Sequence, residues 1–169
     1  MKNIIKKLLN KGRDDDQIDY EFYKTVDIFN NLSKCEIQKL SELFLMRHFK
    51  KGELIFRENY PHVVLYIIKS GEVKLYLSVG KEKVTITDLF SKSHFGEIGI
   101  FLETNRIVSA VASVDTDLIA IKHSDLKKFI KLNPAAGLKL LYNSGRSLSS
   151  DLIERNLKVI HYETKKQNS

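Results

Sequence analysis

The sequence predicts a mainly β domain in which antiparallel strands are flanked by helices. Between Arg47 and Lys122, short runs rich in β-branched and aromatic residues alternate with glycines, a pattern typical of strands joined by turns. Apolar residues at helical spacing lie before and after this region. The strands follow one another without the helical crossovers that parallel strands require, so we expect them to pair antiparallel.

Composition places the chain among globular proteins. Its 169 residues are 43% hydrophobic and 29% charged, with two prolines, which leaves room for one core plus appended helices. No apolar run approaches the roughly 20 residues of a membrane span, and the N-terminus lacks the features of a secretory signal. We therefore expect a cytoplasmic protein. The single cysteine, Cys35, fits a reducing compartment, and its place in a helix predicts a partly buried, inert thiol.

A basic N-terminal helical segment is predicted for residues 1–25. Residues 1–13 carry five Lys or Arg side chains and no acid, so much of the net charge of +7 lies at the chain ends. Ile4, Ile5, Leu8 and Leu9 share one helical face with lysines around it. This helix either docks weakly on an acidic membrane surface or a partner, or packs on its own domain.

The next predicted helix opens with a capping box. Ser33 is followed three residues later by Glu36, the spacing in which each side chain binds the other residue's backbone N–H. Its apolar stripe is Ile37, Leu40, Leu43 and Phe44, and we expect it to end near Met46.

Six strands are predicted, with turns at Gly52, Gly71 and Gly80. The candidate strands span residues 53–57, 63–69, 72–78, 83–90, 106–114 and 116–122. The segment from Gly96 to Arg106 has neither strand nor long helical period, which predicts one short helical turn among the strands.

Two helices follow the strands. Residues from Ser124 form one helix, which Pro134 ends, and residues from Ala135 to about Tyr162 form a longer one whose apolar stripe is interrupted at Gly145. The stripe of the longer helix is Leu138, Leu141, Leu148, Leu152 and Val159. This stripe either covers the strands or pairs with a second copy, which makes a homodimer a candidate. Tyr142 is either a core or dimer contact or a base-stacking residue.

The stretch "HFGEIGIFLETNRIVSAV", residues 94–111, has the chemistry of an anion site. Backbone N–H groups at a helix start bind phosphate, and Gly96 and Gly99 permit close backbone approach. Arg106 adds a planar fork for two phosphate oxygens, and Ser109 adds a hydroxyl donor. Glu97 would repel a phosphate but accepts well from a hydroxyl. A ligand with both a phosphate and a sugar hydroxyl, a nucleotide, satisfies these residues.

The same stretch resembles the phosphate-binding cassette of the cyclic nucleotide-binding domain family, of the catabolite activator protein and protein kinase A regulatory subunit type. The residues that match in order and spacing are Phe95, Gly96, Glu97, Ile98, Gly99, Arg106 and Ser109. Asn105 stands where many members have proline, Ile107 and Val108 replace smaller residues, and Ser109 replaces the commoner threonine. The resemblance covers about residues 26–134, with weaker matches in the leading helix, the turn at Gly71 and the hinge helix.

The resemblance implies an antiparallel, jelly-roll-like β-roll over residues 26–134, with a short cassette helix, and a lid or dimerisation helix and tail over residues 135–169. Glu97 would take the ribose 2′-hydroxyl of cyclic AMP or cyclic GMP. Gly96, nearby amides, Arg106 and Ser109 would take the cyclic phosphate, and no metal is implied. Phe95, Ile98 and Gly99 complete the expected ligand-binding set.

The sequence thus predicts a stand-alone regulatory sensor that binds cyclic AMP or cyclic GMP and repositions its C-terminal helices, with an unidentified effector. The alternative is a degenerate scaffold that docks on a protein or membrane, with Arg106 paired to Glu97 or Glu103. An enzyme is not expected, because no catalytic constellation is visible. Direct DNA binding is not expected either, since eight residues after His161 are too few for a reading module. The five histidines, His48, His62, His94, His123 and His161, lack metal-ligand spacing.

Overall fold

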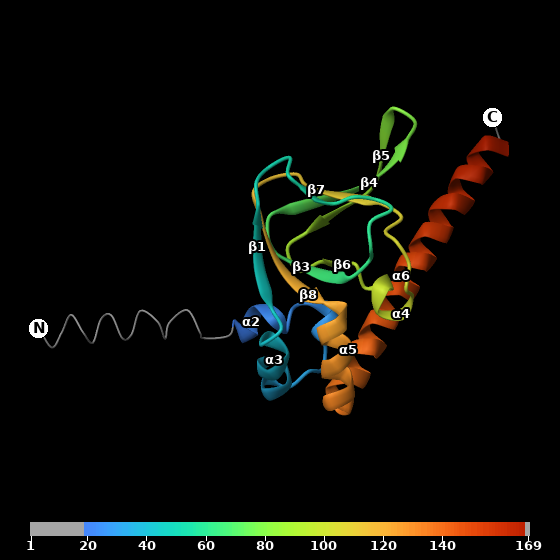
Figure 1. The fold of residues 1–169 in the computed structure, drawn as a ribbon. Helices are drawn as coiled ribbons and strands as arrows, with labels where there is room; N and C mark the ends of the chain where they lie inside the picture. The colour runs from blue at the N-terminus through green and yellow to red at the C-terminus, as the bar shows by residue number, and fades with distance from the viewer. Residues whose placement is uncertain (1–18, 168–169) are drawn as a thin grey trace, which may run out of the picture.

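The mainly β prediction is confirmed. The computed structural model describes residues 19–167, so the predicted basic helix of residues 1–13 lies outside the described residues. Within that range the chain forms two four-stranded antiparallel sheets, in the orders β1-β8-β3-β6 and β2-β7-β4-β5 (Figure 1). The strands are β1 (Leu45–Phe49), β2 (Leu54–Phe56), β3 (Val64–Ser70), β4 (Glu72–Val79), β5 (Glu82–Phe90), β6 (His94–Phe95), β7 (Ser109–Ala112) and β8 (Thr116–Lys122).

Helices precede, interrupt and follow the strands. They are α2 (Tyr20–Tyr23), the 3₁₀ helix η1 (Asp27–Phe29), α3 (Lys34–Ser41), α4 (Ile98–Phe101), α5 (His123–Leu132) and α6 (Pro134–Gln167). Figure 1 shows α2, α3 and α5 at one end of the sheets, while α6 runs past α4 along one side. Between residues 19 and 167, no helix has both the length and the apolar character needed to cross a bilayer.

Alternation along β3 and β8 builds two cores. Successive side chains of a strand point to opposite faces. Ile68 and Leu118 therefore pack between the sheets, against Val73, Phe95 and Ala110. Their neighbours Ile67 and Ile119 point to the other face and pack with the helices. The central strands β3 and β8 of the first sheet thus carry buried side chains on both faces, while the edge strand β1 is largely exposed.

The helical layer is joined by polar contacts as well as by the core. The predicted capping box is confirmed: the Ser33 hydroxyl accepts from the Glu36 N–H at 3.3 Å, and the Glu36 carboxylate accepts from the Ser33 N–H at 2.7 Å. The same carboxylate accepts from Lys139 of α6 at 2.8 Å. Asn143 donates to the carbonyl of Asn30 at 2.7 Å, so α6 is fixed along its first half.

Two predicted boundaries are wrong. The helix that opens at Ser33 ends at Ser41 instead of near Met46, because residues 45–49 pair with β8 as an edge strand. The predicted strand of residues 106–114 is shortened to β7, since Arg106 turns into the interior and only residues 109–112 pair with β4.

One further prediction is corrected, and one is confirmed. Cys35 is exposed on α3 and not partly buried. The turns at Gly52, Gly71 and Gly80 are confirmed, with positive φ at each.

Candidate ligand-binding site

The cassette segment, residues 94–106, begins at β6 in the first sheet and leads toward β7 in the second sheet. Gly96 makes the turn between β6 and α4 with φ of +93°. A Cβ atom there would lie 2.6 Å from the carbonyl oxygen of Val64 on β3. Only glycine permits both this conformation and this approach. Gly96 therefore sets the position of Glu97 and the short predicted helical turn, which is confirmed as α4.

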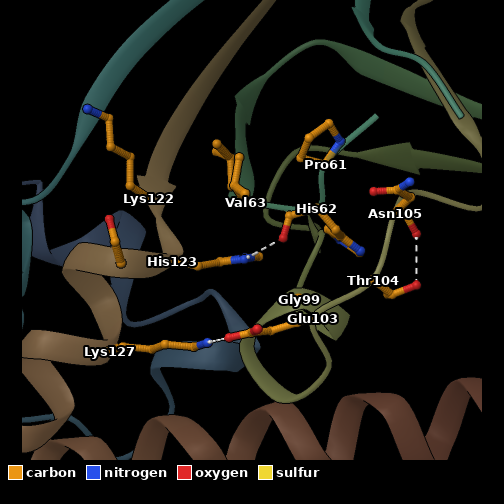
Figure 2. Close-up of a pocket in the computed structure, with 12 residues that line it drawn as sticks. Pro61, His62, Val63, Gly99, Glu103, Thr104, Asn105, Lys122, His123 and Lys127 are labelled. Atoms are coloured by element: carbon orange, nitrogen blue, oxygen red, sulfur yellow. Dashed lines mark hydrogen bonds and ion pairs between the residues drawn. The ribbon is translucent and has the colours of Figure 1, made fainter. Parts of the chain in front are cut away.

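Gly99 lets α4 pack directly on His123, the first residue of α5. A Cβ atom at Gly99 would overlap the His62 carbonyl oxygen and the His123 ring, whose Nδ1 would be 2.7 Å away. The buried ring of His123 connects two carbonyls: Nδ1 lies 3.0 Å from the oxygen of His62, and Nε2 lies 2.9 Å from that of Gly96. Figure 2 shows the ring pointing at the His62 main chain. The cassette and α5 are thus connected through one side chain.

Arg106 is buried without a carboxylate partner. Its side chain is 4% exposed, and its guanidinium carbon lies 3.6 Å from the centre of the Phe56 ring. One Nη donates to the Val64 carbonyl at 3.0 Å. Burial lowers the pKa of the guanidinium to about 10. Within residues 19–167, no carboxylate forms an ion pair with it, and Glu103 pairs instead with Lys127.

Glu97 is buried close to Arg106 in sequence but does not pair with it. The residue is 7% exposed, and its Oε2 has no hydrogen-bond partner among the described residues. Burial raises the pKa of the carboxyl; Asp151 raises it further and Arg155 lowers it. Asp151 and Arg155 belong to α6, so the long helix lies beside this carboxyl group.

A cavity of about 310 Å³ lies between the cassette segment and α6. Leu148, Asp151, Leu152 and Arg155 form its α6 wall. The other lining residues are Phe56, His62, Leu75, Ile86, Thr87, Leu89, His94, Phe95, Gly96, Glu97, Ile98, Arg106, Ile107 and Val108. Apolar side chains thus surround two buried ionisable groups, Glu97 and Arg106, which is typical of ligand sites.

Three buried side-chain atoms of the described residues lack a hydrogen-bond partner: Nε2 of His62, Nε2 of His94 and Oε2 of Glu97. All three residues line this one cavity. Buried polar atoms are normally paired, because an unpaired one costs roughly 1 to 3 kcal/mol. Their concentration here indicates a site built to hold a polar ligand.

Both histidines of the cavity favour the neutral form. Burial lowers the pKa of His62 to about 4, helped by the positive charges of Arg106 and of His123 when protonated. Burial also lowers the pKa of His94, which Asp151 and Asp27 oppose. No group of three or more His, Cys, Asp or Glu side chains that could hold a metal ion occurs in the part of the chain that the structure describes.

Five of the seven expected residues line the cavity: Phe95, Gly96, Glu97, Ile98 and Arg106. Gly99 faces the opposite side of α4, toward a hollow of about 860 Å³ that His62 and His123 also line (Figure 2). Ser109 is placed elsewhere. Its hydroxyl accepts from the Glu58 N–H at 3.1 Å, and the residue lines a third hollow with Tyr76 and Lys83. Ser109, at the start of β7, thus faces a different hollow from Arg106.

Sequence reasoning missed His62, His94, Asp151 and Arg155 as cavity residues. His94 directly precedes the matched cassette residues, and Asp151 and Arg155 lie one helical turn apart on the face that carries Leu148 and Leu152. These local signals were present in the sequence. His62 had no such signal, because the pairing of β3 with β6 brings it to the cassette.

Comparison with known proteins agrees with this geometry. Residues 46–133 match the family model described as the cyclic nucleotide-binding domain. The cyclic AMP receptor protein of Thermus thermophilus is 29% identical over 131 residues, which is 77% of this chain and 61% of the receptor. A cAMP-dependent protein kinase regulatory subunit of Colletotrichum orbiculare is 28% identical over 119 residues, 70% of this chain and 29% of the subunit.

The fold also agrees with that of a solved cyclic nucleotide-binding domain. The crystal structure of a cyclic nucleotide-binding domain from Methylobacillus flagellatus superimposes with a TM-score of 0.75 at 22% identity, covering 84% of each chain. The chain spans less than two thirds of the length of the two relatives named above. The expected β-roll with a short cassette helix and C-terminal helices is confirmed, and this chain belongs to the cyclic nucleotide-binding domain family.

Proposed function

We propose that this chain is a regulatory domain that binds cyclic AMP or cyclic GMP in the cavity between the cassette segment and α6, and that the ligand repositions α5 and α6. One observation carries the proposal. The buried, unpaired Arg106 shares a single cavity with every partnerless buried side-chain atom of the described residues. An unpaired buried charge is costly to keep, and an anionic ligand supplies the missing partner.

Each end of the ligand has a matching group. The Arg106 guanidinium and the backbone amides after Gly96 take the cyclic phosphate, because charge-assisted hydrogen bonds to phosphate are strong. Glu97 accepts from the ribose hydroxyl with the oxygen that lacks a partner. Leu148 and Leu152 of α6 cover the base, since they are the apolar residues of the helical wall.

Repositioning has two physical routes. The long helix α6 forms one wall of the cavity, so a ligand that contacts this wall favours one placement of α6. The ring of His123 connects the Gly96 carbonyl to the start of α5, so a shift of the cassette segment pulls on α5. A ligand changes such an equilibrium only if it binds the two arrangements with different affinity.

Titration calorimetry with cyclic AMP and cyclic GMP tests the binding proposal. Wild type binds at least one of them, and Arg106→Ala loses that binding. Arg47→Ala is the matched control, because Arg47 is exposed on β1, at the opposite edge of the same sheet from β6. Ligand at a hundredfold its dissociation constant raises the free energy of unfolding by about 2.7 kcal/mol. No heat and no thermal shift with either nucleotide would favour the ligand-independent docking module instead.

The exposed face of α6 supports a second copy of this chain as the partner. Leu138, Tyr142, Leu152 and Val159 are exposed, and Gly145, Ser149 and Asn156 continue their alternating spacing of four and three residues. That spacing is the seam of a two-stranded coiled coil, and small residues in its middle permit close approach. We therefore propose a homodimer through α6, with the effector reading the α6 arrangement.

A further inference from the structure

His62 lies in the wall between two hollows of the molecule. It lines the cavity beside Arg106 and also the larger hollow shown in Figure 2. His123 Nδ1 lies 3.0 Å from the His62 carbonyl oxygen, so the His62 backbone lies against the start of α5. The His62 Nε2 is buried and has no hydrogen-bond partner among residues 19–167. Among the described residues this Nε2 is thus left for a ligand, and the neighbouring Gly96 backbone opposes the lowering of the ring's pKa.

The His62 ring lies next to the group proposed to bind phosphate. Its Nε2 would be 3.6 Å from a Cβ atom placed on Gly96, and Nη1 of Arg106 would be 3.4 Å from the same point. The two nitrogens therefore flank the turn at Gly96, where the backbone amides that would meet a phosphate begin. Their electrostatic interaction also shows that they are close, since Arg106 disfavours a positive charge on His62.

The phosphate end of the cavity has fewer donors than the sequence predicted. The Ser109 hydroxyl was expected there, but it is engaged with the Glu58 N–H and lines a different hollow. A phosphate removed from water requires several donors at once. The imidazole of His62 is a side-chain donor that lines the cavity close to Gly96 and Arg106.

We propose that His62 is a further phosphate-binding residue, donating its Nε2–H to a phosphate oxygen of the cyclic nucleotide beside Arg106. This inference rests on the proposed function of the same cavity. A neutral imidazole carries one N–H, so the ligand also selects the tautomer with the proton on Nε2. The contact between His123 and the His62 carbonyl oxygen holds the His62 backbone, and with it the ring, in this position.

The proposal predicts proton uptake when the ligand binds. The groups facing His62 are Arg106, Glu97, His94, Asp151 and Arg155 on the cavity side, and His123, Lys122 and the Lys127–Glu103 pair on the side of the larger hollow. Without ligand, burial and the positive charges of Arg106 and of protonated His123 keep the His62 pKa near 4, against an opposing contribution of the Gly96 backbone. A phosphate anion next to the ring raises that pKa. Between the free and bound pKa values, binding takes up a proton, so affinity rises as pH falls.

Titration calorimetry on the wild-type chain measures this proton uptake and the pH dependence of the affinity directly. Titrations with cyclic AMP and cyclic GMP at about pH 5 and about pH 8 span the range in which histidine changes charge. Parallel titrations in two buffers of different ionisation enthalpy count the protons taken up. Tighter binding at the lower pH with net uptake supports the proposal, and pH-independent binding without uptake overturns it.

Two substitutions separate the roles of the ring. His62→Phe removes the donor and weakens binding about tenfold or more at neutral pH, the expected effect of losing a hydrogen bond to a charged group. His62→Gln keeps an N–H donor, so it binds better than the Phe variant while losing the proton uptake. His48→Gln is the control, since His48 is exposed on β1 in contact with Asp117, and its binding equals that of wild type.

The outcomes distinguish this inference from the proposed function. If wild type binds and Arg106→Ala does not, while both His62 variants bind like wild type, the inference fails and the proposed function stands. If wild type binds neither nucleotide, both fail. Thermal unfolding without ligand accompanies each variant, and a Phe variant that does not fold leaves the Gln variant and the wild-type proton count to decide.

Discussion

The guanidinium of Arg106 stacks on the ring of Phe56, with its central carbon 3.6 Å from the ring centre, and the same carbon lies 5.7 Å from the centre of the Tyr66 ring. Such a cation–π contact is worth about 2 kcal/mol when desolvated, and it orients the planar fork. The contact compensates part of the cost of burying a charge that no carboxylate within residues 19–167 neutralises. The arginine is therefore held in place before any ligand arrives.

Arg106→Met separates stability from binding. We expect the free energy of unfolding without ligand to be unchanged or raised by up to about 2 kcal/mol, because an unpaired buried charge is replaced by an apolar chain. Nucleotide binding is lost in the same variant. Urea denaturation and titration calorimetry measure the two effects. A large loss of stability would show that Arg106 serves the fold rather than a ligand.

Gly99→Ala destabilises the domain through His123. The added methyl would overlap the His123 ring and the His62 carbonyl, and forced overpacking typically costs about 1 to 3 kcal/mol. Adding His123→Ala makes room, so the double variant loses less than the sum of the two single variants. A double-mutant cycle by urea denaturation measures the coupling. Strictly additive losses would contradict the packing contact.

The domain loses stability in mild acid. His62, His94 and His123 have folded pKa values below 6.5, with His62 near 4. The unfolded chain therefore binds more protons, and stability falls as pH decreases from 6.5 toward 4. Glu97 acts oppositely, because its raised pKa favours the folded state at low pH. Urea midpoints across this range measure the slope, which His94→Gln flattens; an equal slope in that variant would contradict the assignment.

Tyr142→Glu tests the α6 dimer. Tyr142 is 65% exposed, so the change costs the single chain little. In a coiled-coil seam it places two carboxylates against each other and weakens association by at least about tenfold. Sedimentation analysis measures the mass. Glu154→Gln, on the outer face of the same helix, is the control and leaves the mass unchanged; equal masses for wild type and Tyr142→Glu would contradict a seam at this residue.

Local patterns predicted much of the fold correctly. The capping box at Ser33, the turns at Gly52, Gly71 and Gly80 and the short helix at α4 all depend on nearby residues. Errors arose where pairing with residues distant in the sequence decides whether a segment becomes a strand. No strand is predicted before residue 53, so β1 is missed, because its partner β8 lies about 70 residues away along the chain.

The candidate site likewise contains residues that the local sequence predicts and residues that only the fold brings together. Glu97, Gly96 and Arg106 were found because their spacing in one short segment carries the pattern. Ser109 was expected beside them, but its hydroxyl accepts from the Glu58 N–H, a contact between residues 51 positions apart in the sequence. His62 was not expected, because only the pairing of β3 with β6 brings it to the cassette segment.

By itself, the sequence determined the mainly β fold class, the family and the residues of the cassette segment, because these follow from spacings of a few residues. The tertiary structure alone decided that Arg106 is buried without an acid, that α6 closes the cavity, and that His62 and His94 face into it. Burial and cavity shape arise from contacts between segments that are far apart along the chain, and these contacts decide which charges lose water and which polar atoms stay unpaired.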